Sequence, residues 1–233
     1  MHGAFADAIG SEVKALARVG TSTMLGAAIA ALREAGIERI AVVGGSAIRD
    51  ACGRDVERVV EESSDGGENL RRALRAWEDG TPLLYLTSDM PFITGTALRD
   101  FLDAVPDRTL ALPLTEWPSF ERRFPGAPPF GITLGGERVV NGGAFVIPAF
   151  AQSRIEALAS RFFDSRKSPW RMAQLAGPAL LMQFALRRLR VAHLETRARA
   201  LLGIPALAVR NAAPELAYDV DTFEEYRYAA ANA

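Results

Sequence analysis

The sequence predicts an α/β protein in which a mainly parallel sheet carries helices on both faces. Short apolar runs at residues 39–45 and 83–87 are rich in Val, Ile and Leu, as in strands buried on both sides. Residues 24–35, 69–77 and 96–105 instead carry apolar side chains at three- and four-residue spacing, which predicts amphipathic helices. Strands that alternate with helices in this way indicate a layered α/β architecture.

The first predicted helix has clear boundaries. Its apolar face runs from Leu25 to Leu32, and Gly36 follows at the position where helices often end in a left-handed residue. The strand at residues 39–45 comes next, so that helix, tight turn and buried strand make half of a βαβ unit. Residues 56–61 and 109–114 are two further predicted strands.

The second half of the chain has weaker periodicity. Residues 117–136 are rich in Pro, Gly and Phe, and we expect a long functional loop or lid there. The predicted elements that follow are a turn into a strand (139–147), a helical tract (153–199), two closing strands (206–210 and 217–220) and a terminal helix (222–231). Within the helical tract, residues 173–189 are the most apolar, which predicts a buried or amphipathic helix starting at Gly177-Pro178.

Composition excludes several classes of protein. The 233 residues are 49% apolar and 24% charged, with a net charge of −1, so binding of nucleic acid through global electrostatics is not expected. The single cysteine, Cys52, excludes an internal disulfide framework and a zinc ribbon. The chain shows neither a secretory signal nor a membrane span, and we expect a cytoplasmic protein without a membrane partner.

Polar residues follow the predicted strands where α/β sheets bind ligands. Ser88 and Asp89 come directly after one strand, and Asp219 and Asp221 lie near the C-terminus. Several carboxylates at converging strand ends indicate a divalent cation such as Mg²⁺. The alternative is that each Asp caps the helix or turn that follows it. For Asp89 we favour the cation, because a Met-Pro pair fixes the turn after the strand.

Four segments resemble, in order and spacing, landmarks of the MobA-like nucleotidyltransferases, which are related to molybdenum cofactor guanylyltransferase and to nucleotidyltransferases of sugar phosphates and lipid precursors. They are residues 14–25 (KALARVGTSTML), 87–92 (TSDMPF), 141–143 (NGG) and 219–225 (DVDTFEE). The resemblance implies a three-layer, Rossmann-like nucleotide-diphospho-sugar transferase fold. It also implies a reaction in which an NTP gives its nucleotidyl group to a small phosphorylated or hydroxylated acceptor and pyrophosphate leaves, with Mg²⁺ or Mn²⁺ as the cofactor.

The resemblance also implies roles for individual residues. Lys14 would neutralise the triphosphate. Asp89 would hold the metal, with Asp219 or Asp221 as a second carboxylate. The residues expected to contact the nucleotide are Gly66, Gly67, Asn69 and Ser88. Those expected on the acceptor side are Asn141, Gly142, Gly143 and Lys167.

One part of the family pattern is not found. Members begin with an apolar strand and a glycine-rich loop that wraps the phosphates, and residues 1–13 resemble neither. We expect these elements to lie outside the chain, unless residues 2–12 substitute for them with different chemistry. Two neighbouring strands should then lack a ladder partner.

The sequence leaves other questions open. We expect one domain over residues 1–233, with a helical insertion at residues 151–203. A non-catalytic nucleotide- or partner-binding domain is an alternative. A Rossmann-type oxidoreductase is a third, because Gly44-Gly45-Ser46 follows a strand, although the full G-x-G-x-x-G pattern is absent. The acceptor, the base preference and the oligomeric state cannot be derived from the residues.

Overall fold

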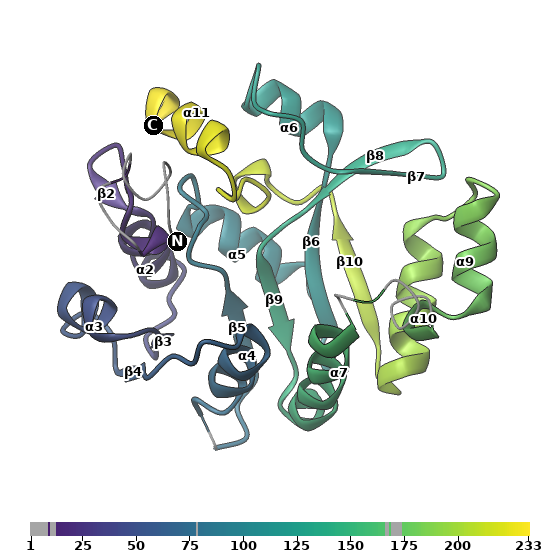
Figure 1. Cartoon of the computed structure of the whole chain (residues 1–233), viewed down its shortest axis with the longest axis horizontal. Coiled ribbons are helices and arrows are strands. Elements are labelled where there is room, and N and C mark those ends of the chain that lie inside the picture. The colour runs from purple at the N-terminus through teal and green to yellow at the C-terminus, as the bar shows by residue number, and fades with distance from the viewer. Residues whose placement is uncertain (1–8, 10–12, 78, 166–167, 169–173) are drawn as a thin grey trace.

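A computed structural model describes residues 9, 13–77, 79–165, 168 and 174–233 (Figure 1). Within this part of the chain, six strands form the main sheet, in the order β5-β9-β6-β8-β7, and β10 pairs with β6. The strands are β5 (Leu83–Leu86), β6 (Leu110–Glu116), β7 (Ile132–Leu134), β8 (Glu137–Asn141), β9 (Ala144–Ile147) and β10 (Ala206–Arg210). The sheet is mixed, because β5, β6, β7 and β10 run in one direction and β8 and β9 in the other.

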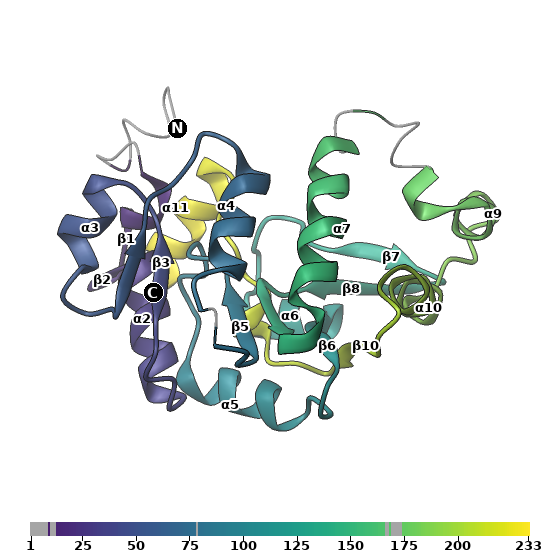
Figure 2. The same cartoon turned by 90° about the horizontal axis from the view of Figure 1, so that it is seen from below.

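Helices cover both faces of the sheet, as the sequence predicts. Figure 2 shows α4 and α7 on one side of the sheet and α5 on the other, where α5 packs against α2. The described helices are α2 (Met24–Glu34), α3 (Ser46–Cys52), α4 (Gly66–Leu74), α5 (Gly95–Asp103), α6 (Trp117–Arg123), α7 (Gln152–Ser165), α9 (Pro178–Ala185), α10 (Val191–Leu202) and α11 (Phe223–Asn232). The short 3₁₀ helices are η1 (Lys14–Leu16), η2 (Ala149–Ala151) and η3 (Pro214–Leu216). The layered α/β prediction is confirmed.

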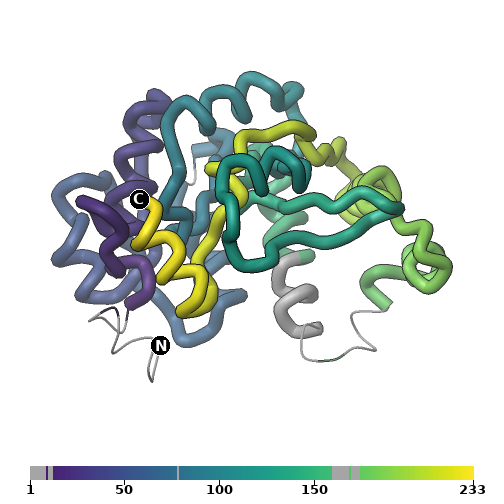
Figure 3. Tube along the Cα trace, turned by 90° about the horizontal axis from the view of Figure 1, so that it is seen from above, coloured from purple at the N-terminus to yellow at the C-terminus, as the bar shows by residue number. Residues whose placement is uncertain are grey.

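Local signals fix several of these boundaries. The Thr23 hydroxyl caps α2 by accepting a hydrogen bond from the Gly26 amide, and Gly36 leaves the helix with a φ of +84°. A reciprocal capping box between Thr222 and Glu225 starts α11. The N-terminal hairpin, β1 (Arg18–Val19) with β2 (Ser22–Thr23), lies against α11 at the other end of the chain (Figure 3).

A second, smaller sheet stands apart from the first. It consists of β3 (Ala41–Val43) and β4 (Arg58–Val60), which pair in parallel. In the described part of the chain, β3 pairs only with β4, and β5 pairs only with β9. A groove of about 680 Å³ lies between β3 and β5, and its walls are formed by these two strands and by α2 and α4. Within the described residues, β3 and β5 therefore each have one ladder partner and face each other across this groove.

The predicted lid at residues 117–136 is wrong. The segment contains α6 and β7, and its aromatic side chains belong to the core. Phe120 and Phe124, one helical turn apart, are buried and pack with Phe130 around Tyr218 at ring-centroid distances of 4.9–6.1 Å. Burying several aromatic rings in one cluster stabilises a fixed structure. The segment is therefore part of the core beside η3 and does not act as a mobile lid.

Three other boundaries differ from the prediction. Residues 217–220 form no strand, because Ala217 ends η3 in a helical conformation and residues 218–220 join no ladder. Helix α4 begins at Gly66 and not at residue 69, since Asp65 supplies the N-cap by accepting from the Glu68 amide. The predicted turn into a strand at residues 139–147 is instead the end of β8, the link at residues 142–143 and β9, and the two strands follow one another along the same edge of β6. Helix α9 begins at Pro178 as predicted, but it contains no buried residue.

Candidate functional site

Asp89 lies in the loop that follows β5, and neighbouring segments hold this loop in place. The Met90 side chain is fully buried beside it. The backbone carbonyl of Asp89 accepts a hydrogen bond from the Val220 amide at 3.0 Å, and the Thr87 amide donates to the Gly143 carbonyl at 2.9 Å. The strand end therefore lies against both the NGG segment and the C-terminal acidic segment.

Lys14 joins two of the predicted carboxylates. Its Nζ donates to Asp89 Oδ2 at 2.6 Å and to Asp221 Oδ1 at 2.8 Å, although Asp221 is 207 positions away in the sequence. Burial of Lys14 opposes its charge, but the Asp89 and Asp221 carboxylates outweigh this and raise its pKa, so the ammonium stays protonated. The Asp89 side chain is 17% exposed and that of Asp221 70%, so the Lys14–Asp89 pair is the shielded one.

Asp219 completes the acidic group without touching Lys14. Burial raises its pKa from 3.8 to about 6, and the nearby charges of Asp89 and Asp221 add to the shift. A carboxyl with this pKa is poorly satisfied in the absence of a cation, because its charged form faces two like charges.

Two buried polar atoms beside β5 lack a hydrogen-bond partner among the described residues. They are Asp89 Oδ1 and Thr87 Oγ1. Buried polar atoms are nearly always satisfied in folded proteins, so an unpartnered pair at a strand end indicates a ligand position. No group of three or more His, Cys, Asp or Glu side chains in the described part of the chain is arranged to hold a metal. Mg²⁺ needs only one or two carboxylates besides water and phosphate oxygens, so Asp89 and Asp221 fit such an ion.

The groove between β3 and β5 brings together residues that the sequence places far apart. Gly66 and Asn69 from α4 line it with Ser88 and Asp89 from the loop after β5. The Asn69 side chain ties down the preceding loop, accepting from the Ser63 amide at 2.6 Å and donating to the Ser63 carbonyl at 2.9 Å. Gly67 is buried in the first turn of α4 and does not line the groove.

The NGG segment reaches this region through its backbone. The Gly142 amide donates to the Pro113 carbonyl at 2.9 Å, and the Gly143 amide to the Leu216 carbonyl at 3.0 Å. A Cβ on Gly142 would collide with that Leu216 carbonyl, and one on Gly143 would collide with Thr87 Oγ1. Both glycines are therefore needed for close packing of three segments. Asn141 is exposed at the end of β8, and Lys167 lies outside the described residues.

Sequence reasoning did not single out two residues of this groove. Thr87 carries one of the unpartnered atoms and precedes Ser88 directly. Tyr85 also lines the groove, and burial, with Asp89 nearby, raises the pKa of its phenol. The signal for Thr87 was its position at the end of an apolar strand. Tyr85 had none, because an aromatic inside a strand is typical of the core.

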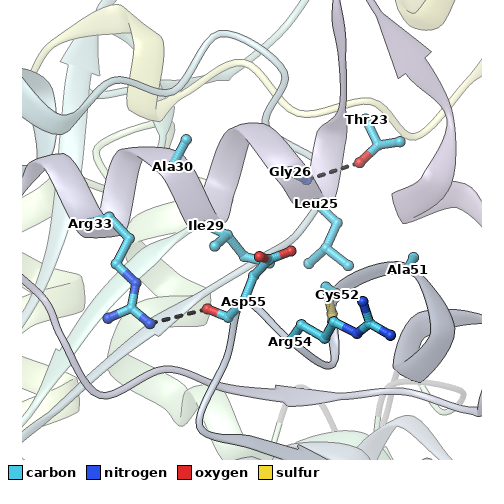
Figure 4. A pocket seen from close by; sticks show the side chains of 10 residues that line it. All are labelled: Thr23, Leu25, Gly26, Ile29, Ala30, Arg33, Ala51, Cys52, Arg54 and Asp55. Carbon is cyan, nitrogen blue, oxygen red and sulfur yellow. Dashed lines mark hydrogen bonds between the residues drawn. The ribbon is translucent and has the colours of Figure 1, made fainter.

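A second cavity, of about 440 Å³, lies between α2 and the end of α3 and contains none of the predicted site residues (Figure 4). Arg33 crosses it to donate to the Asp55 carbonyl at 3.0 Å. Cys52 lines it, but its thiol donates to the Ile48 carbonyl at 3.2 Å, and burial raises its pKa. A protonated thiol is a poor nucleophile, so this cavity offers no catalytic group comparable to the Asp89 cluster.

Comparison with solved structures supports the fold. A hypothetical transferase structure from Thermus thermophilus is 28% identical with a TM-score of 0.84, and the alignment covers 97% of this chain and 95% of that one. CMP:2-keto-3-deoxy-manno-octonic acid synthetase complexed with CTP is 14% identical, with a TM-score of 0.57 and coverage of 94% and 90%. A Mycobacterium tuberculosis protein in complex with manganese is 18% identical, with a TM-score of 0.52 and coverage of 94% and 92%.

Sequence comparison gives the family. No curated protein matches the chain significantly. A family model described as the MobA-like NTP transferase domain matches residues 7–217, which is most of the chain and includes Lys14, Asp89 and the NGG segment. The match includes three of the four sequence segments and ends just before the fourth, at residues 219–225. The resemblance to the family is confirmed, and the chain belongs to the family of MobA-like NTP transferase domains.

Proposed function

We propose that this protein is a nucleotidyltransferase that moves a nucleotidyl group from an NTP to a small phosphorylated or hydroxylated acceptor. An oxygen of the acceptor would attack the α-phosphorus, and the bond between the α- and β-phosphates would break. Pyrophosphate would leave with the bonding electron pair. Such chemistry depends on positioning the reactants and on neutralising the charge of the phosphates. A lysine can neutralise that charge directly, and carboxylates can do so by holding a divalent cation.

The observation that carries the proposal is the Asp89 carboxylate. Its Oδ2 holds Lys14, while its Oδ1 is buried without a partner beside a groove of about 680 Å³. We assign Asp89 to the cation and Lys14 to the phosphates, because a protonated lysine next to the groove offsets triphosphate charge. Gly66, Asn69 and Ser88, which line the same groove, are the proposed contacts to the nucleotide.

A divalent cation fits the donor set. Asp89 and Asp221 would hold it, and Asp219 would gain from a nearby positive charge because its pKa is raised in the cation's absence. A bound Mg²⁺ or Mn²⁺ would neutralise phosphate charge. The Mycobacterium tuberculosis structure with manganese and the synthetase structure with CTP support this combination of metal and nucleotide by similarity of fold.

The acceptor side is proposed from the sequence resemblance and from backbone packing. Asn141 is exposed at the end of β8, and Gly142 and Gly143 connect that strand end to the loop of Asp89. We place the acceptor on this side, with Lys167 as a further cationic contact. A small phosphorylated or hydroxylated molecule suits this side, since a phosphate would pair with the Lys167 ammonium and a hydroxyl would hydrogen-bond to the exposed side-chain amide of Asn141.

Thermal shift with each NTP, in Mg²⁺ or Mn²⁺, is the first test. A ligand at one hundred times its Kd stabilises a protein by about 2.7 kcal/mol. For a domain of this size, that raises Tm by about 5–10 °C. Asp89→Asn should abolish the shift that depends on the metal. The matched control is Glu156→Gln, since Glu156 pairs with Arg75 and its side chain is 19% exposed, close to the value for Asp89. An equal shift in both variants would contradict the assignment.

Turnover separates the proposal from its alternative. A pyrophosphate-release assay with the NTP that gives the largest shift, and a panel of sugar phosphates and hydroxy acids as acceptors, should show release that requires the metal and Lys14. Binding without release for every acceptor would favour a non-catalytic nucleotide-binding domain. Absence of binding for every NTP would contradict both.

A further inference from the structure

Helix α9 presents apolar side chains to solvent. Met182 is 62% exposed and Phe184 70% exposed, and Leu181 and Leu186 are also exposed. None of the residues of α9 is buried, although six of its eight side chains are Ala, Leu, Met or Phe. Large exposed apolar groups gathered on one short helix mark an interaction surface, because a soluble surface normally scatters them singly.

The same segment is strongly basic. Residues 174–194 contain Arg187, Arg188 and Arg190 and no Asp or Glu. All three arginines are exposed, and within the described part of the chain none of them forms an ion pair. With no carboxylate in the segment, this cluster is a local excess of positive charge directly beside exposed apolar side chains.

A cavity lies next to the exposed apolar side chains of α9 and the arginines that follow them. This cavity, of about 610 Å³, lies between the turn at Gly135-Gly136, which joins β7 and β8, and the end of α9. Phe184 and Arg187 both line it. An apolar ring and a guanidinium at one opening match an amphiphile, whose chain needs apolar contact and whose headgroup carries negative charge.

We infer that α9 and the arginines after it dock on the surface of an anionic lipid bilayer. Charge complementarity selects this occupant. A second copy of the chain, packed face to face, would bring the same arginines against each other, because a twofold interface pairs a patch with itself. An anionic membrane instead attracts every one of them.

The helix can lie in the interface but cannot cross it. Eight residues of α-helix are about 12 Å long, and a bilayer core is about 30 Å thick. No helix in the described ranges is long and apolar enough to span a membrane. An apolar face of Leu, Met and Phe flanked by arginines is the pattern of helices that bury one face among the headgroups.

The position of α9 keeps the nucleotide groove free. Helix α9 stands at the outer edge of the molecule beyond α10, and β9, β6 and β10 separate it from β5 (Figures 1 and 2). A protein docked through α9 therefore leaves the groove beside Asp89 open to solvent. The inference stands independently of the proposed function, because it uses no residue of the Asp89 cluster.

Vesicle sedimentation tests the inference with the full chain. Vesicles of phosphatidylcholine alone are compared with vesicles that also contain phosphatidylglycerol, at low and at high salt. We expect binding to the anionic vesicles, weakened by salt, and little binding to the neutral ones. Each basic residue near such a surface contributes about fivefold in affinity, so Arg187→Gln with Arg188→Gln should lower binding about 25-fold.

Two further variants and their controls complete the test. Met182→Ser with Phe184→Ser should lower vesicle binding at least about tenfold, because both side chains would leave the apolar layer. The controls are Arg122→Gln and Phe150→Ser, which change an exposed arginine and an exposed phenylalanine outside the α9 segment. Circular dichroism and Tm, with light scattering for the mass in solution, check that every variant folds. Two results would each overturn the inference: equal binding to both kinds of vesicle, or self-association through α9 without binding to either.

Discussion

Replacing Asp219 by Asn is expected to stabilise the protein at neutral and alkaline pH when no divalent cation is present. Burial, with the charges of Asp89 and Asp221, raises the pKa of Asp219 from 3.8 to about 6. A carboxyl whose pKa is raised by folding stabilises the fold fully below its unfolded pKa, and the contribution is lost as pH rises through the folded pKa. The wild-type protein should therefore lose stability between about pH 4 and about pH 6 that Asp219→Asn retains.

The size of the effect follows from the shift. About two pKa units correspond to about 3 kcal/mol at 1.36 kcal/mol per unit. Asp219 is half-buried, so solvent screening lowers the expected gain to about 1–2 kcal/mol at pH 8. For a domain of this length, the Tm of Asp219→Asn should exceed that of the wild type by about 2–8 °C.

Thermal and urea unfolding at pH 5 and pH 8, in EDTA, measure this difference. The gain should be smaller at pH 5, where part of the Asp219 population is already protonated in the wild type. Saturating Mg²⁺ should reduce or reverse it, because a nearby cation favours the ionised carboxylate. Asp50→Asn, which removes an exposed carboxylate on α3, should behave as the wild type. If the curves of wild type and Asp219→Asn run parallel between the two pH values, the argument from burial fails.

Two packing predictions follow from the site and the core. Gly143→Ala should lower the free energy of unfolding in urea by about 1–3 kcal/mol, because its Cβ would press on Thr87 Oγ1 and the Met90 sulfur. The same change should weaken the stabilisation by NTP. An unchanged unfolding midpoint would show that the contact relaxes freely. Phe120→Ala should lower the free energy of unfolding by about 3–5 kcal/mol, because the side chain is fully buried in the aromatic cluster. A loss below about 0.5 kcal/mol would instead support a lid at residues 117–136.

The elements that the sequence predicted well carry local signals. The repeating apolar face of α2, its stop at Gly36 and the Thr222 capping box depend on residues close together in the chain, so they survive without knowledge of the tertiary structure. Strand β10 was predicted at residues 206–210 and is found there, because a short apolar run between a glycine and an asparagine has few other solutions.

The failures have a common physical cause, which is that packing partners lie far away in sequence. The aromatic residues of 117–136 read as a loop because Tyr218, their shared neighbour, comes about one hundred positions later. The apolar pattern of α9 predicted a buried or amphipathic helix, and it could not show that nothing within the described part of the chain covers Met182 and Phe184. Periodicity identifies an apolar face but does not show which element packs against that face.

The candidate site shows both sides of this limit. The carboxylates near strand ends and the family resemblance together predicted Lys14, Asp89, Asp219 and Asp221 as site residues from the sequence. The ion pairs of Lys14 with both Asp89 and Asp221 could not be derived, because they depend on how η1 lies beside the loop after β5 and the segment before α11. Thr87 was missed because its significance is the unpartnered, buried Oγ1, which is a property of the fold and not of the residue type.

The charge balance of the site predicts how a triphosphate binds. In the described part of the chain, Lys14 is the cation paired with Asp89 and Asp221, and Asp219 adds a third carboxylate nearby. A free triphosphate would bring further negative charge to a cluster that is already negative, so we expect NTP to bind as its Mg²⁺ complex and EDTA to abolish the thermal shift. Binding of free NTP in EDTA would instead require proton uptake, and Asp219 would take the proton first because its pKa is about 6. The affinity in EDTA would then rise as the pH falls toward 6, whereas binding as the cation complex should not strengthen in that direction, since the cation itself prefers ionised carboxylates.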